Sequence, residues 1–233
     1  MIYAAHDIGN SPASAKIAPQ LNILPSEGLV VRRALRGVLE NCLTLRHLVA
    51  GLGNPGREYR LHRHNVGYMV LDELARRYEL LFSRQQAQAL VVDLRLGERQ
   101  VLLAKPKTYM NLSGNSVGQL LNFYQIPDER FILVFDDIDL PIGTLRIRPG
   151  GGSAGQNGAK SVIQRLGTQE FPRLRIGVDR PPGKKAAANY VLRPFSKEQQ
   201  EVMEFVLPRA ADAVEEFVRA GIDAAMNKFN GIL

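Results

Sequence analysis

The sequence predicts an α/β fold: a single-domain three-layer sandwich in which helices cover both faces of a twisted, mixed but mostly parallel sheet. Along residues 47–233, short apolar runs alternate with amphipathic stretches of helical period. The run Phe131–Phe135 contains no polar residue, which is typical of a central strand buried on both faces. The chain has 233 residues, of which 45% are hydrophobic and 23% charged, enough to build one such core.

The first predicted helix, Val66–Leu80, follows the first predicted strand, Leu48–Leu52. Asn65 precedes the helix and is a candidate N-cap. Apolar residues recur at four-residue spacing, and Glu73 stands four positions before Arg77, where the two charges support a helix.

Turn residues separate the later elements. Residues 97–99 join two strands as a hairpin, and Gly167 ends a helix. The strand Thr144–Arg148 alternates, with its arginines on one face. The other predicted elements are the strands Leu90–Leu96, Val101–Lys105, Phe131–Phe135 and Leu174–Val178 and the helices Gly114–Tyr124, Gly158–Leu166 and Ser196–Gly221.

Residues 1–46 form an N-terminal extension with several prolines and a basic helical pattern at Val30–Leu45. The extension lacks a secretory apolar core with a cleavage site, so it is either poorly ordered or the result of a start codon assigned too early. The single cysteine, Cys42, excludes an internal disulfide and fits a reducing compartment. No apolar stretch approaches the roughly 18 residues of a membrane span, so we expect a cytoplasmic protein without a membrane partner.

The net charge favours a polyanionic partner. Lys and Arg number 30 against 23 Asp and Glu, a formal charge of +7. Nucleic acid is the partner class that such a balance suggests, although charge alone is equally compatible with a solvated basic surface.

Polar residues cluster after four of the predicted strands. Ligands of open α/β sheets bind outside the carboxyl ends of the strands, so these segments could converge on one crevice. A histidine and a carboxylate meeting there would form a general base and its orienting group, and asparagine amides could hold a substrate or an oxyanion. Taken singly, each residue is as well explained by a turn, a helix cap or a surface loop. The four segments are residues 54–64, 107–114, 136–139 and 149–158.

Other chemistries fit less well. Gly51, Gly53 and Gly56 have the spacing of a dinucleotide-binding loop, but no helix opens after Gly56. The acids about twenty residues on, Asp72 and Glu73, lie inside a predicted helix and not at the end of a second strand, so no dinucleotide cofactor is expected. The chain has four histidines and His62 and His64 form the sole close pair, so no metal is expected.

Six segments, in order, resemble those of bacterial-type peptidyl-tRNA hydrolases, single-domain esterases that free peptides from prematurely released peptidyl-tRNA and so recycle the tRNA. The resemblance covers about residues 47–230 and implies metal-independent hydrolysis without a cofactor, in the cytoplasm, with a monomer as the default state. The segments are Gly-Leu-Gly-Asn-Pro-Gly (51–56), Arg-His-Asn (63–65), Tyr-Met-Asn-Leu-Ser-Gly (109–114), Asp-Asp-Ile-Asp-Leu-Pro (136–141), the glycine loop with Asn-Gly (157–158) and Arg-Leu-Arg-Ile-Gly (173–177).

The resemblance also implies residue roles. His64 would be the general base, Asp136 the carboxylate that stabilises its basic form, and Asn54 the residue that distinguishes blocked from free aminoacyl groups. Two arginines would bind the 5′-phosphate of the tRNA. The planar guanidinium group of arginine can donate two parallel hydrogen bonds to a phosphate, which suits this task better than the point charge of a lysine. The implied substrate contacts are Tyr59, Tyr109, Asn111 and Asn157 at the acceptor end, Met110 on the peptide side, and Arg148 and Arg175 at the 5′-phosphate.

Two positions depart from the family pattern. Gln156 and Phe135 stand where many members have histidines, so we expect activity to survive with a changed pH profile.

The segment Arg180–Lys185 and the helix from Ser196 onward would form a mobile wall over the cleft. The main alternative function is a non-catalytic RNA-binding protein on the same fold, although such a protein would not need a base paired with a carboxylate.

Overall fold

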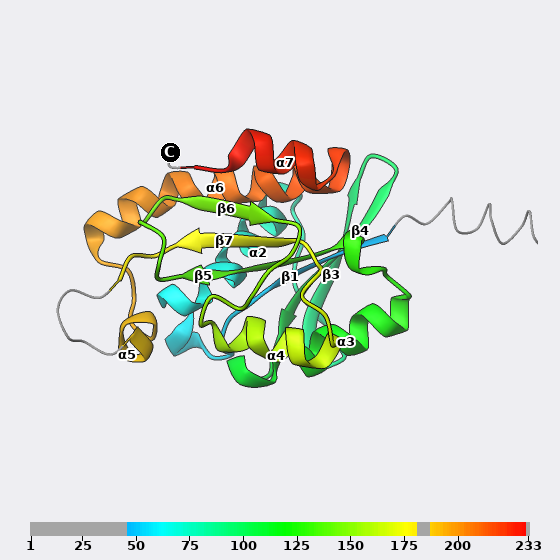
Figure 1. Cartoon of the computed structure of the whole chain (residues 1–233), viewed down its shortest axis with the longest axis horizontal. Helices are drawn as coiled ribbons and strands as arrows, with labels where there is room; N and C mark the ends of the chain where they lie inside the picture. Colours follow the sequence, from blue (N-terminus) through cyan, green and yellow to red (C-terminus); the bar gives the residue numbers. More distant parts are fainter. Residues whose placement is uncertain (1–45, 181–186, 232–233) are drawn as a thin grey trace, which may run out of the picture. The chain divides into compact units, whose positions relative to one another are not determined.

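The computed structural model describes residues 46–180 and 187–231. They form a seven-stranded sheet with helices on both faces (Figure 1), which confirms the predicted three-layer α/β sandwich. The predicted extension up to residue 45, with its helical pattern and Cys42, lies outside the described residues. So do residues 181–186, which make up most of the predicted wall segment.

Parallel strands form the middle of the sheet. The strands are β1 (Arg46–Gly51), β2 (Arg84–Gln86), β3 (Ala89–Leu96), β4 (Arg99–Pro106), β5 (Phe131–Asp137), β6 (Leu145–Arg148) and β7 (Arg173–Gly177). Their order is β2-β3-β4-β1-β5-β7-β6, with β4, β1, β5 and β7 parallel and the others antiparallel to their neighbours. The carboxyl ends of these four parallel strands therefore meet at one edge, which we call the carboxyl edge.

The long helices form two layers on opposite faces of the sheet (Figure 1). They are α2 (Val66–Arg77), α3 (Ser113–Tyr124), α4 (Asn157–Leu166), α6 (Lys197–Ala220) and α7 (Ile222–Phe229). Helices α2, α6 and α7 share a buried cluster with Val49 of β1, whereas α3 and α4 share another with Leu48 and Ala50. Successive residues of β1 thus enter opposite cores, as expected for a strand covered on both faces. Among the described residues, no helix is long and apolar enough to span a bilayer.

The strands and helices predicted between Leu48 and Gly221 are all present, but short elements were missed. β2 consists of Arg-Gln-Gln and has no apolar period, and α5 (Ala187–Val191) has five residues. α7 was not predicted because the apolar pattern of α6 runs up to Gly221, whose φ of 88° ends the first helix and starts the second. The remaining short pieces are the 3-10 turns η1 (Arg57–Tyr59), η2 (Arg63–Asn65), η3 (Met110–Leu112) and η4 (Asp128–Arg130).

Asn65 occupies the N-cap position of α2, but its side chain does not cap the helix, so this prediction is wrong in its mechanism. The side chain instead pairs with the backbone of Asn54: Oδ1 accepts from the Asn54 amide at 3.0 Å, and Nδ2 donates to the Asn54 carbonyl at 2.9 Å. An asparagine that engages a remote loop gives the same sequence signal as a helix cap. Asn65 therefore fastens the glycine-rich loop to the start of α2.

The glycines after β1 allow the chain to pack closely on itself. A Cβ on Gly51 would lie 2.3 Å from the carbonyl oxygen of Gly67, and a Cβ on Gly67 would lie 2.4 Å from that of Val134. A Cβ on Gly53 would meet the Tyr68 ring at 2.7 Å. The spacing that resembles a dinucleotide loop therefore serves the close crossing of α2 over β1 and β5.

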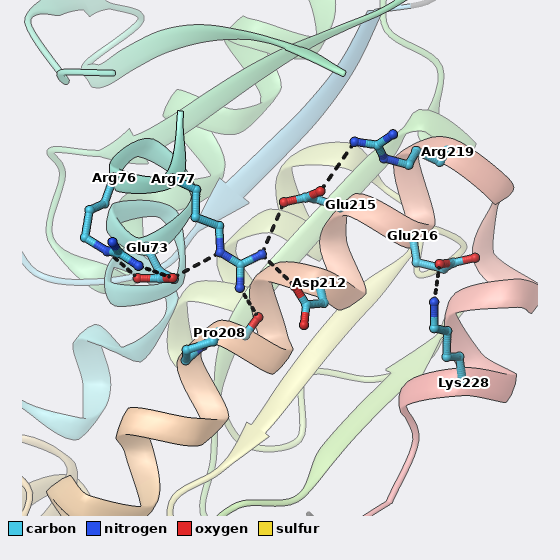
Figure 2. Close-up of polar contacts among 9 residues, drawn as sticks. All are labelled: Glu73, Arg76, Arg77, Pro208, Asp212, Glu215, Glu216, Arg219 and Lys228. Carbon is cyan, nitrogen blue, oxygen red and sulfur yellow. Dashed lines mark hydrogen bonds and ion pairs between the residues drawn. The ribbon is translucent and has the colours of Figure 1, made fainter. Parts of the chain in front are cut away.

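A charged cluster joins α2 to α6 (Figure 2). The predicted pair of Glu73 and Arg77 is present, with Nε of Arg77 at 3.0 Å from the carboxylate. The same guanidinium contacts Asp212 at 2.6 Å, Glu215 at 3.2 Å and the Pro208 carbonyl at 2.7 Å. Arg77 thus links two helices that pack on the same face of the sheet.

Candidate functional site

A cavity of about 520 Å³ opens at the carboxyl edge. All four polar segments predicted to converge there contribute to it, and it has an additional wall from α5 and the residue that follows. The lining residues are Asn54, His64, Tyr109, Met110, Asn111, Asp136, Ile138, Ala154, Gly155, Gln156, Asn157, Ala187, Ala188, Val191 and Leu192. The catalytic candidates predicted from the sequence therefore share one pocket.

His64 and Asp136 form a hydrogen-bonded pair in this pocket. The Nδ1 atom of His64 lies 2.9 Å and 2.8 Å from the two carboxylate oxygens of Asp136. Asp136 is the sixth residue of the buried central strand β5 and is 3% exposed, while His64 sits in the η2 turn and is 11% exposed. A carboxylate at Nδ1 favours the tautomer that carries the proton there, which leaves Nε2 as the basic nitrogen.

Gln156 holds the other side of Asp136. Its Nε2 donates to Asp136 Oδ1 at 3.2 Å, and its Oε1 accepts from the amide of Ala159 at 2.7 Å, which caps the N-terminus of α4. One buried amide thus fixes the carboxylate and starts the helix that follows the glycine loop. Sequence reasoning identified position 156 as a departure from the family pattern but not as a partner of Asp136.

Asn54 presents a defined side of its amide to the pocket. Its Oδ1 accepts from the backbone amide of Met110 at 3.1 Å, and its backbone is paired with Asn65. Because the oxygen is engaged, Nδ2 is the group left to donate to a ligand. The contact between Asn54 and Met110 could not be predicted, since the two residues come from loops after different strands.

The remaining predicted substrate contacts divide into two groups. Tyr109, Asn111 and Asn157 line the pocket and are exposed, with Tyr109 at 69%, whereas Met110 is buried in its floor at 6%. Tyr59 does not belong to the lining; its ring packs edge-on against that of His62, 5.4 Å away.

Arg148 and Arg175 lie outside the lining, on a common face of the sheet. The antiparallel register sets Arg148 opposite Arg173 and Arg146 opposite Arg175, and directly opposite residues point the same way. Arg175 is half-buried and forms an ion pair with the buried Asp137. Arg146 and Arg148 are the exposed members of the set, which confirms the predicted alternation of β6.

The expectation that the segment after Arg148 begins at the carboxyl edge is wrong. β6 is antiparallel to β7, so it ends opposite Arg173, the first residue of β7, at the other edge. The loop then returns to the pocket at residues 154–157. The buried guanidinium of Arg173 donates to the carbonyls of Gly151 and Gly152, and burial lowers its pKa to about 10. The glycine run is therefore anchored by the chain's own arginine.

The described residues contain no group of three or more His, Cys, Asp or Glu side chains placed to hold a metal ion. The pocket offers one imidazole, one carboxylate and several amides. This donor set suits proton transfer and hydrogen bonding to a polar substrate.

The model of the peptidyl-tRNA hydrolase family matches residues 48–232. The chain belongs to this family. The peptidyl-tRNA hydrolases of Syntrophomonas wolfei and Chloroflexus aurantiacus are 44% and 46% identical to it over 183 and 184 residues, which is 78% of this chain and 99% and 98% of theirs. The crystal structure of peptidyl-tRNA hydrolase from Acinetobacter baumannii has a TM-score of 0.76 at 32% identity, covering 82% of this chain and 97% of that one.

Membership of the peptidyl-tRNA hydrolase family confirms the predicted resemblance and the enzyme class, a hydrolase acting on esters. The matched region begins two residues after the predicted domain boundary at 46, which stays a prediction. Of the two departures from the family pattern, Phe135 is fully buried in the core beside α3 and α4, and Gln156 binds Asp136.

Proposed function

We propose that the chain hydrolyses the ester that joins the peptide to the 3′-terminal adenosine of peptidyl-tRNA, with His64 as the general base. The pairing of His64 Nδ1 with both oxygens of Asp136 carries this proposal. The base, its carboxylate and the amides line a pocket large enough for a terminal nucleotide or an aminoacyl group.

In this mechanism Nε2 of His64 takes a proton from water while the oxygen attacks the ester carbonyl carbon. Asp136 stabilises the imidazolium that forms, and that imidazolium returns the proton to the ribose oxygen as the carbon–oxygen bond breaks. General base assistance contributes about 10²–10⁴ in rate, so orientation and oxyanion stabilisation must supply much of the remainder.

The amides have separate roles in the proposal. Nδ2 of Asn54 is a donor that suits the carbonyl of an N-blocked aminoacyl group, whereas the ammonium of a free aminoacyl group offers no acceptor in its place. Asn111 and Asn157 stand in the exposed part of the pocket, where the acceptor end would enter. Tyr109 is exposed beside them and suits stacking on a base.

The acceptor stem would be held through its phosphates by Arg148 and Arg175. Arg148 is exposed and close in register to Arg146, while Arg175 is already paired with Asp137 and would share its charge with a phosphate. Binding of this kind falls steeply with salt and does not depend on tRNA sequence. Tyr59 is a further contact in the proposal, outside the pocket lining.

The base, its carboxylate and the amide donors already converge within one copy of the chain, so a monomer is the default state in the proposal. A cytoplasmic location belongs to the proposal as well, since peptidyl-tRNA is the product of cytoplasmic translation.

The test is release of the peptide from N-acetylaminoacyl-tRNA, with free aminoacyl-tRNA alongside, by the unmodified chain and His64→Ala. We expect multiple turnovers on the blocked substrate alone and their loss in the variant, with tRNA binding retained. Arg95→Ala is the control, because Arg95 is exposed on β3 and does not line the pocket. Tight tRNA binding without turnover in the unmodified chain would instead indicate the RNA-binding alternative.

A further inference from the structure

Arg63, the residue before the proposed base, is buried. Its guanidinium reaches the segment that joins α5 to α6. Nη1 donates to the carbonyls of Tyr190, Arg193 and Pro194 at 3.3, 3.1 and 2.9 Å, and Nη2 donates to Gln199 Oε1 at 2.5 Å. The backbone takes part too, because the amide of Arg63 donates to the Arg193 carbonyl at 3.1 Å.

No carboxylate lies within ion-pair distance of Arg63 in the part of the chain that the structure describes. Its partners are neutral carbonyls, one amide oxygen and two aromatic faces, Tyr190 at 4.0 Å and Phe195 at 5.5 Å from the ring centroids. A buried cation is costly unless its hydrogen bonds are made. Those of Nη1 and Nη2 are made only with the segment in this position, while Nε is buried without a hydrogen-bond partner. The segment and the catalytic turn therefore stabilise each other.

Residues 187–192, which include α5, form one wall of the pocket. Ala187, Ala188, Val191 and Leu192 all line it, and all four side chains are apolar. A second tether supports the wall: the Tyr190 hydroxyl donates to the Val178 carbonyl at 2.8 Å and accepts from Gln199 Nε2 at 3.2 Å. Arg63 and Tyr190 thus hold the wall to the turn that carries His64 and to the end of β7.

We propose that Arg63 is a positioning residue that keeps this apolar wall in place for the side chain of the peptide's C-terminal residue, the one esterified to the tRNA. This inference rests on the proposed function, because it assigns the peptide side of the same pocket. Met110 and Ile138 line the pocket as well and give the side chain an apolar environment. Burial of a large apolar side chain contributes to affinity, whereas glycine gains nothing from the wall.

The test compares Arg63→Lys with Arg95→Lys, an exposed arginine on β3 outside the pocket lining. Both variants keep the charge, but lysine cannot reproduce the fork of hydrogen bonds. For N-acetylleucyl-tRNA we expect the KM of Arg63→Lys to rise about tenfold, the effect of one decade in affinity. For N-acetylglycyl-tRNA the KM should change less than threefold. In both cases kcat and its pH profile should match those of Arg95→Lys.

A fall in kcat, a shifted pH profile or an equal loss on both substrates would overturn the proposal, because each would indicate an effect on His64 or on the whole fold. Tyr190→Phe, which removes the second tether and leaves the aromatic face, should raise the same KM in the same direction. If Arg63→Lys does not fold, the KM of Tyr190→Phe tests the proposal in its place. Hydrogen exchange of residues 187–195 without substrate should be faster in Arg63→Lys than in Arg95→Lys, and equal exchange would count against the tether. An unmodified chain without turnover would refute the proposed function. The hydrogen-exchange comparison would still test whether Arg63 tethers the wall, because it needs no turnover.

Discussion

Changing Gln156 to glutamate should make the activity fall at alkaline pH while leaving it intact near neutrality. The substitution keeps the oxygen that accepts from the Ala159 amide, so the cap of α4 survives. It replaces the Nε2 donor, 3.2 Å from Asp136 Oδ1, by an oxygen. When the new carboxyl is protonated, its hydroxyl can donate to Asp136 as the amide does now. When it is ionised, two carboxylates face each other.

The repulsion is large enough to decide the protonation state. Two unit charges at the present 3.2 Å separation interact with about 5 kcal/mol at an effective dielectric constant of about 20. This raises the pKa of the pair's second proton well above the ordinary carboxyl range, so one proton stays on the pair at neutral pH. Above that pKa the hydrogen bond to Asp136 is lost. A hydrogen bond to a charged group contributes about 1.5–3 kcal/mol, so its loss should lower kcat about tenfold or more.

The assay is kcat on N-acetylaminoacyl-tRNA against pH, with Gln164→Glu as the control. Gln164 lies on the exposed side of α4, so its substitution changes the net charge equally without touching Asp136. The raised pKa also makes the stability of Gln156→Glu depend on pH. Between the ordinary and the raised carboxyl pKa, the folded state binds more protons than the unfolded state. The melting temperature of the variant should therefore fall as pH rises through that window. A profile identical to that of Gln164→Glu, or a loss of activity at low pH, would refute the idea that Gln156 orients Asp136.

Three further predictions concern the fold and the tRNA. Arg77→Met should lower the free energy of unfolding by about 2 kcal/mol, because it removes the link between α2 and α6 drawn in Figure 2, as measured by urea denaturation. Gly67→Ala should cost about 2–3 kcal/mol by thermal unfolding, because its Cβ would lie 2.4 Å from the Val134 carbonyl oxygen. Arg148→Gln should reduce the slope of log affinity against log salt for tRNA by about 1 and leave kcat unchanged.

Each of these predictions has a matched control. Arg76 pairs with Glu73 but its side chain is 72% exposed, so Arg76→Met should destabilise the fold much less than Arg77→Met. Equal losses at the two arginines would contradict the account of the junction. A Cβ on Gly152 meets nothing within 4 Å, so Gly152→Ala should be tolerated. For the salt slope, Arg95→Gln removes a charge away from the proposed phosphate site and should leave the slope unchanged.

The fold could be predicted from the sequence because its signal is local and repetitive. β5 is apolar from Phe131 to Phe135, α2 repeats its apolar residues at helical spacing, and Gly167 adopts the left-handed conformation that ends α4. Each of these features needs only neighbouring residues. The elements that were missed, β2, α5 and α7, are short or adjoin a longer helix, and tertiary contacts decide whether such segments form.

Only part of the candidate site could be predicted from the sequence. His64, Asp136 and Asn54 could be selected because they stand in segments that resemble those of the family, and strand order brings these segments together. The groups that hold them could not be selected. Asn65 looks like a helix cap, Gln156 like a neutral replacement of a histidine, and each is identified only by a partner 11 or 20 positions away in the chain.

Arg63 shows why such supporting residues escape sequence reasoning. Its partners lie 127 to 136 positions further along the chain and are mostly backbone carbonyls, which every residue type carries. No complementary charge marks them in the sequence. An arginine next to a proposed catalytic histidine therefore has the same pattern whether it binds a phosphate, faces solvent or holds a wall of the pocket. Only its burial against neutral oxygens and two aromatic rings separates these cases, because a phosphate-binding arginine must remain accessible to its ligand.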